Sequence, residues 1–155
     1  MNKHLASKFA QVLGALRDKH AIRLDGPGTD AVTAWFLGPK GENGELMHQL
    51  VRSALDAHLQ FRQDVYPEDP RFITPEMQAA PSYKRSVEAL RRDFDDVLNA
   101  LKESGAFFSM RSQGHMLWDV TIPGLAGYFA AMLYNQNNVA AEASPVTTMM
   151  EIAVG

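Results

Sequence analysis

The chain has 155 residues and no cysteine, so it can form neither a disulfide nor a thiolate metal site. Such a composition fits the reducing cytosol, and we expect a cytoplasmic protein. The net charge of -3 leaves no basic excess, and the lysines and arginines are mixed with acids. This pattern argues against nucleic-acid binding.

Long apolar runs are also missing. The longest uncharged stretch, 120–141, is interrupted by Pro123, Gly124 and Gly127 and contains the polar run 135–138. Too few continuous apolar residues remain to cross a bilayer. The first residues lack the apolar core of a signal peptide. We therefore expect no membrane segment.

Charge is scarce in the last third of the chain, residues 107–155. Apart from His115, its acids and bases are Arg111, Asp119, Glu142 and Glu151, whereas the first 106 residues hold the other 29 of the 33 Asp, Glu, Lys and Arg residues. A soluble domain normally spreads its charge over its surface, because charged side chains are rarely buried unpaired. We expect this third to be covered, by the rest of the chain or by further protein.

What the sequence does contain is helical periodicity, with apolar residues recurring at spacings of three and four. Hydroxyl residues followed by proline, at Thr74-Pro75 and Ser144-Pro145, are typical of helix starts. No clear alternation predicts a half-buried sheet, so we expect a mainly α chain. The expected helices cover 3–20, 42–64, 82–103, 121–133 and 146–154.

Two groups of residues offer metal ligands but lack the pattern of a site. His48 and His58 are ten apart, which does not place them on adjacent turns of one helical face. Asp93, Asp95 and Asp96 lie in a predicted helix with mixed charges, where a solvated face is the expected role. We expect no metal site.

Several uncommon strings occur in a fixed order: Phe36-Leu37-Gly38-Pro39-Lys40-Gly41-Glu42-Asn43, Tyr66-Pro67-Glu68-Asp69-Pro70, Phe107-Phe108-Ser109-Met110-Arg111-Ser112-Gln113-Gly114-His115-Met116, Tyr134-Asn135-Gln136-Asn137-Asn138-Val139 and Glu142-Ala143-Ser144-Pro145-Val146-Thr147-Thr148. Together they resemble the N-terminal part of the group II pyridoxal-phosphate-dependent amino acid decarboxylases. Within that family, the strings resemble most those of bacterial tyrosine-decarboxylase-like members. The resemblance runs from about Trp35 to the end of the chain.

The resemblance implies that this mainly α chain is the N-terminal helical segment of a fold-type I α/β enzyme that uses pyridoxal 5'-phosphate. It divides the chain into a helix and linker at 1–34, a helical segment at 35–106, and a pocket-lining loop with apolar helices at 107–155. Family members are several times longer, and their large domain supplies the lysine that holds the cofactor. The six lysines of this chain lie in no matching motif. We therefore expect no catalytic residue here and no covalently bound cofactor.

The resemblance also assigns roles to single residues. Substrate-binding residues would be Phe108, Met110, Arg111, Gln113 and His115, together with Asn137 and Val139 reaching across a dimer into the partner's pocket. Cofactor-phosphate contacts would be Ser144, Thr147 and Thr148. A plain helix cap explains Ser144 equally well, and a satisfied loop histidine explains His115.

Burial statistics favour core positions over pocket positions for the aromatic residues of this region. They are Phe107, Phe108, Trp118, Tyr128 and Phe129.

Two functions follow as alternatives. The first is a truncated part or subunit of an L-amino acid decarboxylase, inactive alone, that contributes a dimer interface and pocket walls. Its partner would be a second copy or a cofactor-bearing domain, and its substrate an aromatic or, second, an acidic amino acid. Relatives read Pro-Arg-Tyr where this chain reads Met110-Arg111-Ser112, so aromatic specificity does not follow directly. The second is a stand-alone helical interaction protein that oligomerises through its apolar last third.

Overall fold

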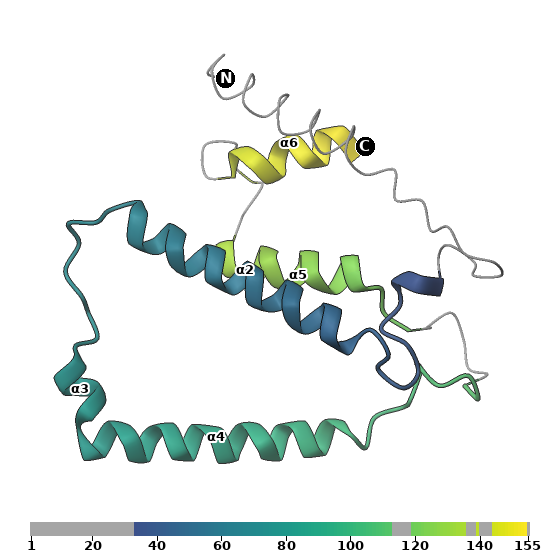
Figure 1. Cartoon of the computed structure of the whole chain (residues 1–155), viewed down its shortest axis with the longest axis horizontal. Helices are drawn as coiled ribbons and strands as arrows, with labels where there is room; N and C mark the ends of the chain where they lie inside the picture. Colours follow the sequence, from purple (N-terminus) through teal and green to yellow (C-terminus); the bar gives the residue numbers. More distant parts are fainter. Residues whose placement is uncertain (1–32, 113–118, 136–138, 140–143, 155) are drawn as a thin grey trace. The chain divides into compact units, whose positions relative to one another are not determined.

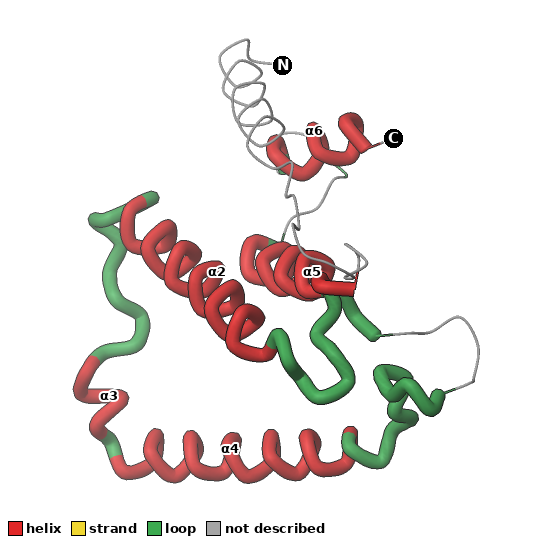
Figure 2. The backbone as a smooth tube through the Cα atoms, turned by 45° about the vertical axis from the view of Figure 1, so that its right-hand side comes forward, coloured by secondary structure: helices red, strands yellow, loops and turns green. Residues whose placement is uncertain are grey.

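The computed structural model describes residues 33–112, 119–135, 139 and 144–154, and the expected helix over 3–20 lies outside them (Figure 1). Within these ranges the chain is helical, with no β-strand and one isolated antiparallel bridge between Phe36 and Thr121. The elements are η1 (Thr33–Trp35), α2 (Gly44–Asp64), α3 (Pro75–Ala79), α4 (Pro81–Leu101), α5 (Ile122–Tyr134) and α6 (Pro145–Val154). Figure 2 shows the same helices in red and the described loops and turns in green. The mainly α prediction is confirmed.

The predicted hydroxyl–proline start of α3 is confirmed. Thr74 is its N-cap, and the Met77 backbone N–H donates to Thr74 Oγ1 at 3.3 Å. Pro75 follows at a position whose N–H would have no helical partner, so the missing donor costs nothing. The predicted position of the last helix start is also confirmed, because α6 begins at Pro145.

The segment between α2 and α3 differs from the structure that the sequence predicts. Proline disfavours helix for the residue before it, which predicts an extended run over 66–70. Instead the chain makes a tight turn there, in which the Asp69 N–H donates to the Tyr66 carbonyl at 3.1 Å. Pro67 occupies the second position of this turn, which suits the fixed φ of proline.

The chain forms two compact units. One combines Met1–His58 with Val120–Gly155, and the other is Leu59–Asp119, so the boundary falls inside α2. The three-part division at 1–34, 35–106 and 107–155 stays a prediction.

In the first unit, α2 and α5 lie side by side (Figures 1 and 2). The ring of His58 in α2 meets the ring of Tyr134 in α5 edge-on, with centroids 4.8 Å apart and planes at 79°. Ile122, at the start of α5, is only 1% exposed and is the one buried apolar side chain of the described residues. Among the described residues of these two helices, Ile122 and His58 are the buried side chains.

His58 is the most buried residue of α2, at 9% exposure. The sequence pattern places it beside the apolar stripe of that helix, as an ordinary helix residue. The structure instead buries it, on a line with the partly buried Met47, Val51 and Ala54. Spacings of four, three and four residues put these side chains on one helical face.

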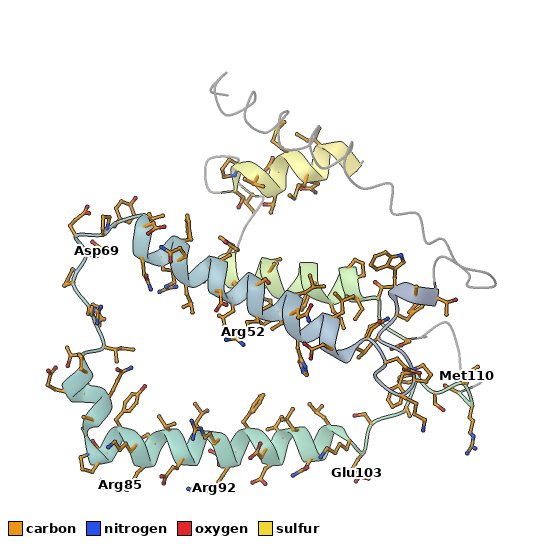
Figure 3. The ribbon with its side chains drawn as sticks, viewed as in Figure 1. Arg52, Asp69, Arg85, Arg92, Glu103 and Met110 are labelled. Atoms are coloured by element: carbon orange, nitrogen blue, oxygen red, sulfur yellow. The ribbon has the colours of Figure 1, made fainter. Side chains whose placement is uncertain are left out.

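In the second unit, α4 carries an apolar stripe that the described residues leave uncovered. Leu90 is 67% exposed and Phe94 59%, and Val97 and Leu101 on the same face are also exposed. The apolar residues of α4 recur at helical spacing but are not packed against other described residues. The carboxylates between 93 and 96 are exposed on the same helix. Arg85 and Arg92 are labelled on α4 in Figure 3.

Candidate functional site

Of the residues assigned to substrate or cofactor, Gln113, His115 and Asn137 lie outside the described part of the chain. The others fall in three places. Phe108, Met110 and Arg111 are in the loop after α4, Val139 follows α5, and Ser144, Thr147 and Thr148 lie at the start of α6.

The loop after α4 is built from successive tight turns. The Ser109 N–H donates to the Ala106 carbonyl at 2.9 Å, and the Ser112 N–H donates to the Ser109 carbonyl at 2.9 Å. Ser109 Oγ also accepts from the Arg111 N–H at 3.3 Å. Since the backbone satisfies its own donors locally, the turns can present side chains outward. The prediction of a loop is confirmed for its described residues.

The side chains of this loop face outward. Met110, labelled in Figure 3, is 86% exposed, and Phe107, Phe108 and Arg111 are exposed as well. An apolar pair with a neighbouring guanidinium can form one wall of a pocket for a ligand that has an apolar body and a carboxylate.

Core placement of the aromatic residues is wrong for three of them. Phe107, Phe108 and Tyr128 are exposed, Phe129 is half-buried, and Trp118 lies outside the described residues. Burial statistics describe complete domains, whereas the described part of this chain supplies no layer over these side chains. Much of the charge-poor last third is thus exposed where the structure describes it, although Ile122 and Ser144 are buried.

The end of α5 is capped by Asn135. Asn135 adopts the left-handed conformation, with φ 46° and ψ 46°, and its N–H donates to the Ala131 carbonyl at 3.0 Å. Asparagine tolerates this conformation better than most residues, so it ends the helix sharply. Val139 beyond it is 90% exposed.

The start of α6 is the described region that best suits a phosphate. Ser144 is fully buried, and its carbonyl accepts from the Thr148 N–H at 3.0 Å. Thr148 Oγ1 is buried with no hydrogen-bond partner among the described residues. A buried hydroxyl near a helix start can donate to an anion. Of the three hydroxyl residues, Thr148 is therefore the one whose described surroundings suit a phosphate contact.

Among the described titrating groups, Glu76 at the start of α3 has a shifted pKa. The Thr74 hydroxyl and the backbone N–H of Glu76 itself lower the pKa of this carboxyl group. This shift belongs to a helix start in the second unit and to none of the assigned residues.

Across the helices that the structure describes, none is long and apolar enough to span a membrane. The same residues hold no group of three or more His, Cys, Asp or Glu side chains placed for a metal ion.

No protein-family model matches the chain. Three L-tyrosine decarboxylases do: the protein of Levilactobacillus brevis is 40% identical over 126 residues, that of Enterococcus faecalis 37% over 130, and that of Enterococcus faecium 32% over 126. Each match covers 80% of this chain. The chain spans only about a fifth of the length of these curated relatives, 20% to 21%. Identity at this level over such a stretch establishes common ancestry, and the chain is a homologue of the N-terminal portion of a group II pyridoxal-phosphate-dependent amino acid decarboxylase.

Proposed function

We propose that this chain forms part of the substrate pocket and of the subunit interface of a pyridoxal-phosphate-dependent L-amino acid decarboxylase. The observation that carries the proposal is the similarity to three L-tyrosine decarboxylases over four fifths of the chain. The exposed loop after α4 and the start of α6 supply suitable groups. The cysteine-free sequence supports a cytoplasmic location.

Pyridoxal phosphate, when bound, withdraws the electrons left behind when the substrate loses CO2. The residues of this chain orient the substrate and shield the reaction from water. Phe108 and Met110 supply an apolar wall, and Arg111 offers donors for a carboxylate. His115 presents a polar group to the substrate, and Gln113 completes the wall.

The segment after α5 serves a neighbouring pocket in this proposal. Asn137 and Val139 reach a partner subunit, and the exposure of Val139 supports contact with other protein. Ser144, Thr147 and Thr148 donate to the cofactor phosphate, where each hydrogen bond to the charged group is stronger than a neutral one. None of these residues breaks or forms a covalent bond, so the isolated chain is inactive.

The interface role is supported by the apolar side chains that the described residues leave exposed. They include Leu90 and Phe94 on α4, Tyr128 and Met132 on α5, and Ile152 on α6. Monomeric soluble proteins rarely expose so many large apolar side chains, and such surfaces mark contacts with other protein. A homodimer, or a cofactor-bearing partner, would cover them.

A segment exchange tests the proposal. In the Levilactobacillus brevis L-tyrosine decarboxylase, the matched residues would be replaced by their counterparts from this chain. We expect the chimera to bind pyridoxal phosphate and to release CO2 from an L-amino acid, because the matched segment supplies walls and contacts rather than the electron sink. A folded, cofactor-loaded chimera that decarboxylates neither aromatic nor acidic amino acids would contradict the assignment.

The same chimera addresses specificity. The family resemblance places the string Pro-Arg-Tyr at the positions of Met110, Arg111 and Ser112. Met110→Pro combined with Ser112→Tyr restores that string. If these positions line the pocket, kcat/KM for tyrosine relative to glutamate rises by about tenfold, the effect of one well-placed contact. An unchanged ratio would remove these positions from the pocket wall.

The alternative function, a stand-alone helical interaction protein, rests on the same exposed apolar surface. It predicts that the purified 155-residue chain forms a stable oligomer of defined size by light scattering. It also predicts that the chimera fails to support decarboxylation. The two functions thus differ in the outcome of one exchange experiment.

A further inference from the structure

Asn43, the residue just before α2, makes three hydrogen bonds to one short segment. Its side-chain Nδ2 donates to the Ala34 carbonyl at 3.0 Å and to the Phe36 carbonyl at 2.6 Å. Its backbone N–H donates to the Leu37 carbonyl at 3.0 Å. An amide NH₂ carries two donors, and here both are used on backbone oxygens. The residue therefore ties the start of α2 to residues 34–37.

The turn between these residues is shaped to allow this contact. Gly38 and Gly41 have φ of 92° and 72°, and the Gly41 N–H donates to the Gly38 carbonyl at 2.8 Å. The Glu42 carboxylate accepts from the Lys40 N–H at 2.9 Å. Positive φ at two glycines reverses the chain within four residues. The turn thereby brings Asn43 next to residues 34–37.

Residues 34–37 also contact a part of the chain that is far away in the sequence. The Leu37 N–H donates to the Val120 carbonyl at 3.1 Å, and Phe36 forms an antiparallel bridge with Thr121. Thr121 is the N-cap of α5: its Oγ1 accepts from the Gly124 N–H at 3.3 Å. A continuous chain of hydrogen bonds thus runs from Asn43 to the first turn of α5.

We propose that Asn43 is the positioning residue that fixes α5 against α2. Together with the contact between His58 and Tyr134, it ties these two helices at both ends. Along the sequence, this helix lies between the candidate residues that precede it and Val139, which follows it. That link to a site rests on the proposed function, whereas the positioning of α5 does not.

The substitution Asn43→Asp tests the role with a nearly isosteric side chain. It removes both donors and sets a carboxylate oxygen against the Ala34 and Phe36 carbonyls, which repel it. Asn43→Ala removes the donors without the repulsion. Asn99→Asp is the matched control, because the Asn99 Oδ1 accepts from Lys102 Nζ at 2.7 Å on exposed α4 and the change preserves that acceptor.

Amide hydrogen exchange in the full 155-residue chain provides the readout. At neutral pH we expect the Leu37 and Leu125 amides of Asn43→Asp to exchange at least tenfold faster than in the parent. Leu125 is the sharper reporter, since its N–H donates to the Thr121 carbonyl at 3.0 Å, 82 positions from the substitution. Amides in the middle of α4 keep their rates, and Asn99→Asp changes neither reporter.

A pH series separates positioning from a general loss of structure. As pH falls through the pKa of the introduced carboxyl group, which the two carbonyls raise, the protonated group regains a donor. Protection of Leu37 and Leu125 then recovers in Asn43→Asp and not in Asn43→Ala. Unchanged Leu125 exchange in Asn43→Asp, or equal losses in α4, would overturn the proposal.

Asn43→Ser covers the case in which Asn43→Asp unfolds. It retains one short donor, and we expect a smaller loss of protection confined to Leu37 and Leu125. A loss that spreads through α4 overturns the proposal here too. These measurements need no cofactor or substrate, so a negative result leaves the decarboxylase assignment to be judged by the exchange experiment.

Discussion

At the scale of single residues, the burial of His58 depends on the side chains around it more than on its residue type. It is buried in α2 against the ring of Tyr134. We expect His58→Ala and Tyr134→Ala each to lower the free energy of unfolding. The pair should couple by about 0.5–1.5 kcal/mol in a double-mutant cycle, the value for an edge-to-face aromatic contact.

Chemical denaturation of the four proteins of this cycle measures the coupling. His48→Ala is the matched control, because His48 is an exposed residue of the same helix. It should change the free energy of unfolding by less than about 0.5 kcal/mol. Additive effects of His58→Ala and Tyr134→Ala would show that the ring contact is not formed in solution.

A second prediction concerns the turn before α2. Gly38 has φ of 92°, and a Cβ added there would meet the Glu42 carboxylate. Gly38→Ala should destabilise the chain by about 1–2 kcal/mol, because a side chain disfavours this backbone region. Gly44→Ala is its control: this glycine begins α2 with nothing within 4 Å of an added Cβ, so the change should be neutral or stabilising. Thermal unfolding compares the two variants.

A third prediction concerns Glu76. Its pKa is lowered by the Thr74 hydroxyl and by its own backbone N–H, so its charged form is favoured in the folded state. The support that it gives to α3 is therefore present at neutral pH and is lost as pH falls through the lowered pKa. An NMR titration should give Glu76 a midpoint below the ordinary value for glutamate. Thr74→Val should raise that midpoint, and an unchanged midpoint would exclude the hydroxyl as the cause.

At the scale of elements, α4 is a helix whose apolar face has no partner among the described residues. Leu90→Gln with Phe94→Gln should leave the helical circular dichroism of the chain unchanged, because these side chains are already exposed. It should reduce self-association, since two large apolar groups leave the surface. Light scattering measures this, with Ala100→Gln as the exposed control on the same helix. Loss of helicity in the double variant would mean that the stripe is packed in solution.

The limits of the helices were predictable because their signals are local. Thr74-Pro75 and Ser144-Pro145 start helices where expected, and the periodic stretch over 42–64 becomes α2 at 44–64. Which side chains are buried in the folded chain was harder to predict from the sequence. The pattern in α2 identifies its apolar side chains and does not reveal that His58, rather than Leu55, is the residue that is buried. That choice depends on where Tyr134 comes to lie, which is a long-range fact.

The candidate site was predictable only through resemblance. Nothing in the spacing of Phe108, Met110 and Arg111 indicates a pocket, and the structure presents them on exposed turns. Asn43 escaped prediction altogether, because a half-buried asparagine before a helix is typical of a plain cap. Its bonds to the Ala34 and Phe36 carbonyls depend on the two positive-φ glycines beside it.

At the scale of the whole molecule, the described residues bury very little apolar surface. Ile122 is their one fully buried apolar side chain, whereas the chain contains 46% hydrophobic residues. A core this small offsets little of the entropy lost on folding. We expect the isolated chain to unfold with low stability, to show helical far-UV circular dichroism and to bind the dye ANS through its exposed apolar side chains. Absence of dye binding would contradict this expectation.

The prolines that begin α3, α4 and α6 have a consequence for how the protein is made. Each fixes the boundary of its helix from neighbouring residues alone. A growing polypeptide leaving the ribosome can therefore adopt these boundaries before residues further along the chain have been synthesised. The register of each helix is settled early, and only the docking of finished helices waits for the surfaces that cover them.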